Sequence, residues 1–275
     1  MKKIIFVLSF IGIAFMGFAQ MNMAVNAKAP KPITLPSDSF DAEGYKVDLY
    51  YLAHASLVIA IRDGQETTWV YVDPVSRMGE TDIDYSVLPE ADLVLYTHDH
   101  PDHIDKKALE QHATDRTMII APFSCRGMVD QAKVTQNAEY LLNDKVYKYG
   151  NSSVPIFVKA VPAYNTTKGR EQFHPKGKGN GYMLTIGKKW TLYIAGDTEP
   201  IPEMADFAKE FQIEVALLPV NQPYTMTPEQ FESAVKVLKP HVVIPYHMGD
   251  TKMDKAIIRV KKNFGTDIRF HEELR

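Results

Sequence analysis

The amino-acid sequence predicts an α/β fold with four layers, an α/β/β/α sandwich in which helices cover two packed β-sheets. In each half of the chain, short apolar segments typical of strands come first, and segments typical of helices come later. Hydrophobic residues make up 45% of the 275 residues, which is ordinary for a globular protein and sufficient for a large core.

The first half of the predicted domain contains short strands separated by turn residues such as Asp63-Gly64. The run at residues 93–96 is apolar throughout, as expected for a strand that is buried on both faces. Strands are expected at residues 47–52, 57–61, 69–72, 93–96 and 118–121, and helices at residues 104–111 and 127–132.

The second half repeats this order of strands and helices. One helix start is well marked, because Thr227 can cap the helix, Pro228 fits its first position and Gln230 follows three residues after the cap. Strands are expected at residues 157–161, 182–186, 192–195, 215–219, 242–245 and 268–270, and helices at residues 202–211, 227–238 and 254–263.

The N-terminus has the pattern of a secretory signal peptide. Lys2 and Lys3 precede an apolar run at residues 4–18 that is short for a membrane span, and the small residue Ala19 follows. We expect cleavage after Ala19 and export to the periplasm or the medium, so that no stable membrane anchor remains. An uncleaved anchor is the alternative for this segment.

The expected organisation is therefore a signal peptide at residues 1–19, an extended lead-in at 20–44 and a hydrolase domain at 45–275. The lead-in is rich in proline and serine and shows little periodicity. The formal net charge of −3 argues against a nucleic-acid partner, because such proteins normally present a basic face. Cys125 is the only cysteine, so any metal must be held by histidine and carboxylate.

The segment that carries chemistry runs from Thr97 to His103 and directly follows a predicted buried strand. His98 and His100 are two residues apart, a spacing that points both rings to the same side at the end of a strand. The chain then turns at Pro101, which can bring Asp102 and His103 towards the same space. Zinc, manganese and ferrous iron accept imidazole and carboxylate ligands when thiolate is absent.

Two later residues have the same local setting. Asp197 follows the strand expected at 192–195, and His247 follows the strand expected at 242–245. Active sites collect where strands end and loops begin. Together with the histidine cluster, these residues provide enough ligands for two metal ions.

These segments resemble the metallo-β-lactamase superfamily. Residues 97–103 match its T-H-x-H-x-D-H motif, while Gly196-Asp197 and Tyr246-His247 resemble its two later metal motifs. Further segments, His54-Ala55-Ser56 among them, resemble the branch that includes L-ascorbate-6-phosphate lactonase-like and N-acyl-phosphatidylethanolamine phospholipase D-like hydrolases. The similarity extends roughly from residue 45 to residue 275.

The resemblance implies that His98 and His100 hold a first metal ion and that Asp197 bridges it to a second. The superfamily usually supplies a third histidine to the first ion from the loop after the strand near residue 161. This chain has Asn165 in that loop. Either Asn165 or water takes the place, or His174 enters from further along the loop, or the first site is weak.

For the second ion, the resemblance implies that Asp102, His103 and His247 are the ligands. Asp102 is also the expected catalytic residue, because it can orient a metal-bound hydroxide. His54 is an additional candidate that lies near the site in the resembling branch, either contacting substrate or supporting a ligand, and a satisfied core histidine is its alternative.

The expected function is that of an exported metal-dependent hydrolase that cleaves an ester, lactone, amide or phosphodiester bond. One or two Zn²⁺ ions are expected, with Mn²⁺ or Fe²⁺ as alternatives, and bound hydroxide as the nucleophile. A cationic stretch suggests an anionic small-molecule substrate; it contains Lys168, Arg170, Lys176 and Lys178. Two alternatives remain open: an iron-dependent oxidoreductase of the same fold, and a non-catalytic metal-binding protein on a degenerate site.

Overall fold

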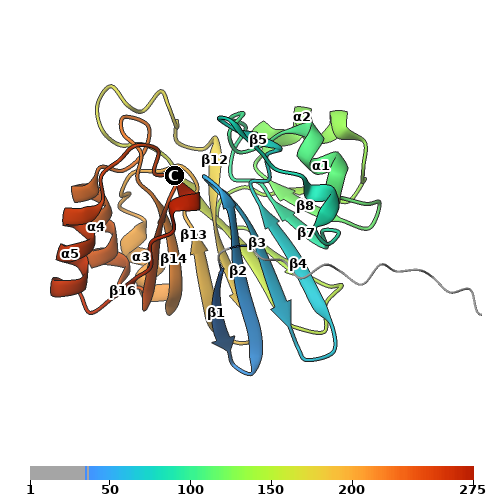
Figure 1. Ribbon diagram of the computed structural model, residues 1–275, viewed down its shortest axis with the longest axis horizontal. Helices are drawn as coiled ribbons and strands as arrows, with labels where there is room; N and C mark the ends of the chain where they lie inside the picture. Colours follow the sequence, from blue (N-terminus) through green and yellow to red (C-terminus); the bar gives the residue numbers. More distant parts are fainter. Residues whose placement is uncertain (1–34, 36) are drawn as a thin grey trace, which may run out of the picture. The chain divides into compact units, whose positions relative to one another are not determined.

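The computed structural model describes residue 35 and residues 37–275, and it contains two seven-stranded sheets with helices against them (Figure 1). The predicted α/β/β/α sandwich is confirmed. The signal peptide expected at residues 1–19 and most of the lead-in lie outside the described residues. None of the helices in the described part of the chain has the length and hydrophobicity of a membrane-spanning segment.

The first sheet has the order β1-β2-β3-β4-β7-β8-β9. Its first four strands form an antiparallel meander, and β4, β7, β8 and β9 run parallel. The strands are β1 (Ser37–Ala42), β2 (Tyr45–Ala53), β3 (Ser56–Arg62), β4 (Thr67–Val72), β7 (Leu93–Leu95), β8 (Met118–Ala121) and β9 (Ala138–Tyr140). A separate short hairpin consists of β5 (Arg77–Met78) and β6 (Thr81–Asp82).

The second sheet has the order β10-β11-β12-β13-β14-β15-β16 and repeats this plan. Strands β10 to β13 are antiparallel, whereas β13 to β16 are parallel. The strands are β10 (Val146–Tyr149), β11 (Ile156–Ala163), β12 (Gly179–Ile186), β13 (Trp190–Ile194), β14 (Ile213–Pro219), β15 (Val242–Tyr246) and β16 (Asp267–Ile268).

The inner strands of the first sheet, such as β3 and β7, are buried on both faces, and successive side chains enter different cores. In β7, Leu93 and Leu95 belong to the core shared with the second sheet, whereas Val94 belongs to the core under the helices. The same alternation separates Val70 and Tyr71 in β4. Side chains alternate in this way along every strand, so an unbroken apolar run satisfies both layers.

The helices are α1 (Lys106–His112), α2 (Arg126–Ala132), α3 (Met204–Glu210), α4 (Pro228–Leu238) and α5 (Asp254–Asn263). Figure 1 shows α1 and α2 beside β7 and β8, and α3, α4 and α5 on the side of β14 and β16. The predicted cap of α4 is present, because the Thr227 hydroxyl accepts from the Gln230 N–H and the Gln230 side chain accepts from the Thr227 N–H. Three short 3₁₀ helices lie at Tyr85–Val87, Phe123–Cys125 and Glu272–Leu274.

The folded unit begins before residue 45. Residues 37–42, expected within the extended lead-in, form β1 and pair antiparallel with β2. Phe40 of this strand packs against Trp190 of the second sheet, with ring centroids 5.8 Å apart. Its polar first residues, Ser37-Asp38-Ser39, do not look like a strand, because its inward positions hold the charged Asp38 beside Phe40 and the small Ala42.

Asp38 is held by three donors from other parts of the fold. Its carboxylate accepts from the Tyr51 hydroxyl at 2.7 Å, from Arg269 Nη1 at 2.8 Å and from His271 Nε2 at 2.8 Å. Burial opposes ionisation, but the hydrogen bonds from His271, Tyr51 and Arg269 prevail and lower the pKa of Asp38 to about 2. The charged cluster therefore ties β1 to the segment after β16.

We expect Asp38→Asn to destabilise the protein at neutral pH by about 1–2 kcal/mol. A folded-state pKa below the unfolded value of about 3.9 gives stability that is present above pH 4 and disappears as the pH falls towards 2. Denaturant unfolding of both proteins across this pH range should show that the difference between their free energies of unfolding shrinks as the pH falls. A difference that stays constant down to pH 2 would contradict the low pKa of Asp38 in the folded protein.

Candidate metal centre

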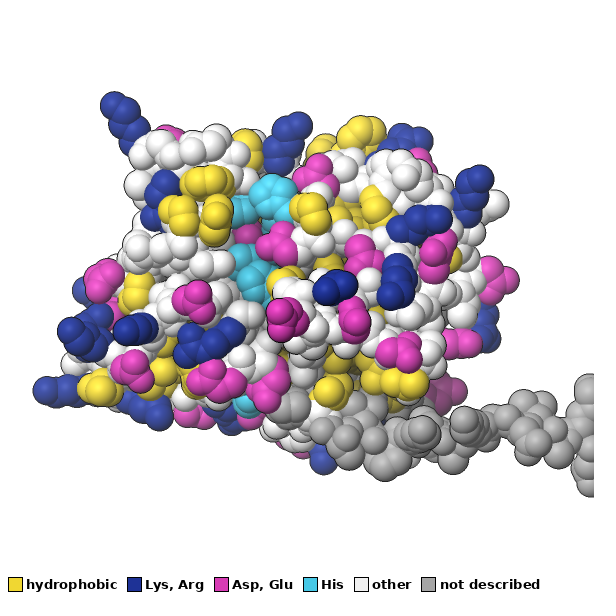
Figure 2. All heavy atoms as spheres, turned by 45° about the horizontal axis from the view of Figure 1, so that its top comes forward, with side chains coloured by type: hydrophobic (Ala, Val, Ile, Leu, Met, Phe, Trp, Pro, Cys, Tyr) yellow, Lys and Arg dark blue, Asp and Glu magenta, His cyan; other side chains and the backbone are white. Residues whose placement is uncertain are grey.

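Loops at the carboxyl ends of four parallel strands bring the predicted ligands together. Asp73 follows β4, the segment 97–103 follows β7, Asp197 lies just beyond β13, and His247 follows β15. β4 and β7 belong to the first sheet, and β13 and β15 belong to the second. Within each sheet, parallel strands deliver their carboxyl ends to one edge, so residues distant in sequence come together there. Figure 2 shows histidine and acidic side chains gathered at the centre of one face.

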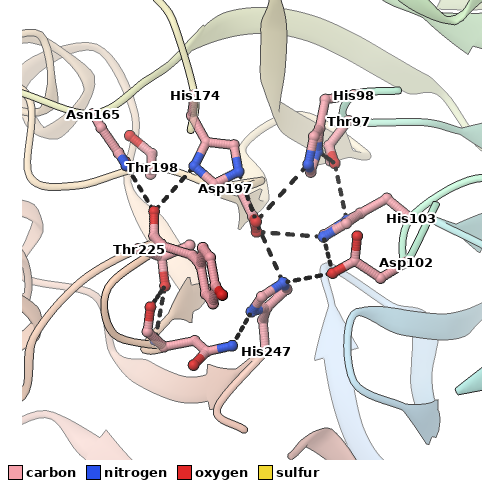
Figure 3. Close-up of polar contacts among 12 residues, drawn as sticks. Thr97, His98, Asp102, His103, Asn165, His174, Asp197, Thr198, Thr225 and His247 are labelled. Carbon is pink, nitrogen blue, oxygen red and sulfur yellow. Dashed lines mark hydrogen bonds and ion pairs between the residues drawn. The ribbon is translucent and has the colours of Figure 1, made fainter. Parts of the chain in front are cut away.

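The buried carboxylate of Asp197 is the centre of the cluster (Figure 3). Its Oδ2 lies 3.1 Å from His174 Nε2, 3.3 Å from His247 Nε2 and 3.8 Å from His98 Nε2. Its Oδ1 lies 3.5 Å from His103 Nε2. Asp197 therefore faces four imidazoles from three separate loops, because His98 and His103 share the segment after β7, and this is the position that a bridging ligand needs.

A second carboxylate, Asp102, lies on the other side of His247. Its Oδ2 is 3.4 Å from the Nε2 atoms of both His247 and His54, and 4.0 Å from His103 Nε2. The Asp102 side chain is 41% exposed, unlike the imidazoles around it. It is therefore the acidic ligand candidate that can also meet solvent or substrate.

The ligand atoms form sets that could each hold a cation. Within each set, the atoms lie within 4.8 Å of one another. The sets are His98, His100 and His174; His98, His103 and Asp197; and His54, Asp102, His103 and His247. The six residues implied as ligands by the resemblance are thus brought together, and two of the additional candidates, His54 and His174, join them.

Asp73 anchors the histidine segment from behind, and it is fully buried. Its carboxylate accepts from the Thr97 N–H at 2.7 Å, from the Thr97 hydroxyl at 2.6 Å and from His103 Nδ1 at 2.8 Å. Because the Thr97 proton goes to Asp73, Thr97 Oγ1 accepts from His98 Nδ1, 3.0 Å away. Both imidazoles consequently present the lone pair of Nε2 to the centre.

The loop between β11 and β12 brings both candidates for the third ligand of the first ion, His174 and Asn165, close to the centre. His174 enters the first set, where its Nδ1 donates to the Tyr224 carbonyl oxygen at 3.0 Å. Asn165 also reaches that oxygen, donating to it at 2.6 Å and to the Arg170 carbonyl oxygen at 3.1 Å (Figure 3). The Asn165 amide nitrogen is thus placed to support the loop, while its buried Oδ1 has no hydrogen-bond partner among the described residues.

Burial and charge give these groups the protonation states that a cation requires. Desolvation lowers the pKa values of His98, His100 and His247, so these rings favour the neutral form that binds metals. Burial opposes the ionisation of Asp197, but His247 and His103 hold its pKa well below the ordinary value. His103 is the exception: burial opposes its protonation, but the carboxylates of Asp197 and Asp73 raise its pKa well above the ordinary value, so this ring must give up a proton to bind a cation. The site therefore offers three neutral imidazoles around an ionised carboxylate.

The centre leaves an unusual number of buried polar atoms without partners. In the described part of the chain, these atoms include the Nε2 atoms of His54, His98, His103, His174 and His247 and the Oδ1 atom of Asp197. A buried polar atom left unsatisfied costs about 1–3 kcal/mol. One or two cations at this point would satisfy all six atoms, so the residues fit a metal centre.

A cavity of about 210 Å³ opens beside the first set. His100, Phe173 and Lys178 contribute to its lining. The predicted cationic stretch is only partly available to a ligand, because Arg170 pairs with Glu199 at 2.9 Å and Lys176 with Glu203 at 2.7 Å. Lys178 is the member of that stretch that lines the cavity.

Comparisons with known proteins agree with this geometry. Residues 48–247 match the family model described as "Beta-lactamase superfamily domain". A "UPF0173 metal-dependent hydrolase" of Thermococcus kodakarensis is 34% identical over 160 residues, 58% of this chain and 67% of the relative. A similarly named protein of Myxococcus xanthus is 30% identical over 244 residues, 86% of this chain and 82% of the relative. A crystal structure of a Parabacteroides distasonis protein is 37% identical, with a TM-score of 0.75 over 88% of this chain and all of its own.

Because His174 and Asn165 lie in different positions, we expect their substitution to reduce the affinity for metal by different amounts. We expect Asn165→Ala to weaken metal binding by roughly 10–100-fold, because it removes a support of the His174 loop. His174→Ala should weaken it further and remove the ion held by the first set. Competition with a chromophoric chelator measures both affinities. A larger loss in Asn165→Ala than in His174→Ala would show that the asparagine itself is the ligand.

Proposed function

This chain belongs to the metallo-β-lactamase superfamily and is a metal-dependent hydrolase, and from that premise we propose that it cleaves an ester, lactone, amide or phosphodiester bond of a small molecule. The observation that supports the proposal best is the convergence of five unpartnered imidazole nitrogens on Asp197 and Asp102. No hydroxyl or thiol nucleophile is required, since a bound divalent ion supplies a Lewis acid and lowers the pKa of water to near 7.

The protein residues hold and orient the reacting groups. His98, His100 and His174 present one set of nitrogen donors, and Asp197 lies between this set and His247. Donors of this kind suit Zn²⁺, and they also accept Mn²⁺ and Fe²⁺. We propose one or two Zn²⁺ ions as the resident cofactor.

Asp102 is the proposed catalytic carboxylate. Burial opposes its ionisation, but the neighbouring rings of His247 and His54, each 3.4 Å away, keep its pKa well below the ordinary value, so it stays ionised. Its partial exposure leaves it accessible to the attacking water, from which it can accept a hydrogen bond. The proposed role is to direct the lone pair of that water towards the substrate.

The cavity favours a compact substrate with an apolar portion and a negative charge. Its volume of about 210 Å³ is smaller than a drug-sized site, and Phe173 and Ala163 contribute apolar surface. Lys178 supplies a positive charge at the wall, in keeping with an anionic group on the substrate.

We expect His98→Ala/His100→Ala to lose bound metal and all turnover, because two nitrogen donors of the first set disappear together. The panel of probes is bis(p-nitrophenyl) phosphate, p-nitrophenyl acetate, a γ-lactone and a β-lactam, each assayed with and without chelator. His241→Ala serves as the control, since His241 is an exposed residue paired with Glu214. Elemental analysis measures the metal, and full turnover in the double variant would refute the proposal.

Export is part of the proposed function and rests on the pattern of residues 1–19. We expect the full chain expressed in a Gram-negative host to be recovered from the periplasm, shortened by its first 19 residues. A variant that starts at Gln20 should remain in the cytoplasm. Mass spectrometry of each fraction measures the cleavage site, and an uncleaved chain in the membrane fraction would favour an anchor instead.

A further inference from the structure

His54 lies in the turn between β2 and β3 and has a left-handed backbone conformation, with φ of 55°. That conformation costs a non-glycine residue roughly 1–2 kcal/mol. Two other residues of the centre share it, Asp73 with φ of 42° and His247 with φ of 50°. Backbone strain of this kind persists where the surrounding structure holds a functional side chain in place.

The imidazole of His54 has a defined tautomer. Its Nδ1 lies 3.0 Å from the main-chain oxygen of Arg275. A main-chain oxygen only accepts, so Nδ1 carries the hydrogen and Nε2 keeps its lone pair. The Nδ1 atom of His174 is held in the same way by the Tyr224 carbonyl oxygen, and that of His103 by the Asp73 carboxylate. Metal-binding histidines are commonly oriented by such a hydrogen bond from the other ring nitrogen.

The free lone pair of His54 points into the second ligand set. Its Nε2 is buried without a hydrogen-bond partner, lies 3.4 Å from Asp102 Oδ2 and falls within 4.8 Å of donor atoms of His103 and His247. We propose that His54 is a fourth protein ligand of the second cation site, alongside Asp102, His103 and His247. This assignment rests on the proposed function, because it assumes that the centre binds metal.

His112 shows that anchoring alone does not make a ligand. Its Nδ1 donates to the Ala108 carbonyl oxygen at 2.6 Å, and its Nε2 is also buried without a partner. Its ring, however, stacks on Tyr71 and belongs to none of the ligand sets in the described part of the chain. His54 differs because its lone pair meets a carboxylate and other imidazoles.

The main chain fixes His54 and His247 against each other. The His54 N–H donates to the Glu273 carbonyl oxygen at 2.9 Å, and its carbonyl oxygen accepts from the His247 N–H at 3.2 Å. Their rings lie 3.7 Å apart between centroids. This contact offsets the strained backbone of both residues and keeps their Nε2 atoms on the same side.

The test uses nuclear magnetic resonance of the full chain, with isotopically labelled histidine nitrogens and an NMR-active cadmium isotope as the probe. Of the nine histidines, we expect coupling to cadmium for His54, His98, His100, His103, His174 and His247. His54→Gln should lose one coupled nitrogen and bind its second cadmium at least tenfold more weakly. His112→Gln is the matched control and should keep every coupling.

The wild-type spectrum decides the assignment even if a variant fails to fold. Cadmium coupling to the other five histidines without coupling to His54 would overturn the inference and leave the proposed function standing. A protein that binds no cadmium would contradict both the assignment of His54 and the proposed function. An unchanged set of couplings in a folded His54→Gln, checked by thermal melting, would likewise exclude His54 as a ligand.

Discussion

The buried carboxylate of Asp197 is the constraint on which the rest of the centre depends. Four imidazoles face it, and they come from three loops that follow β7, β11 and β15. An isolated buried carboxylate would be too costly to keep ionised. The polar cluster therefore requires the two-sheet core around it, and that core in turn leaves the cluster dry enough for its charges to interact strongly.

A second layer of contacts sets the direction of each ring. Asp73, the Tyr224 carbonyl oxygen and the Arg275 main-chain oxygen each take the hydrogen of one imidazole and turn its other nitrogen inward. Three elements far apart in sequence supply these acceptors. Loss of any one acceptor would leave its ring free to change tautomer or rotate.

The sandwich, and the position of the candidate ligands at strand ends, could be predicted from the sequence because both follow from local patterns. Runs such as 93–96 are apolar on both faces, and His98, Asp197 and His247 directly follow such runs. It could not decide between Asn165 and His174, because the path of the 165–178 loop depends on contacts with residues 223–225. β1 was missed for a related reason, since its inward Asp38 is stabilised only by partners distant in sequence.

The loop that carries His174 is held in place by a buried charge of its own. Glu199 is fully buried, accepts from the N–H groups of Thr166 and Thr167, and pairs with Arg170. Arg170 also donates to the Pro223 carbonyl oxygen at 2.5 Å. Because a buried carboxylate is stable only while its donors stay in place, opening this loop would expose an unpaired charge. These contacts hold the loop in place as one wall of the cavity, which Phe173 and Lys178 help to line.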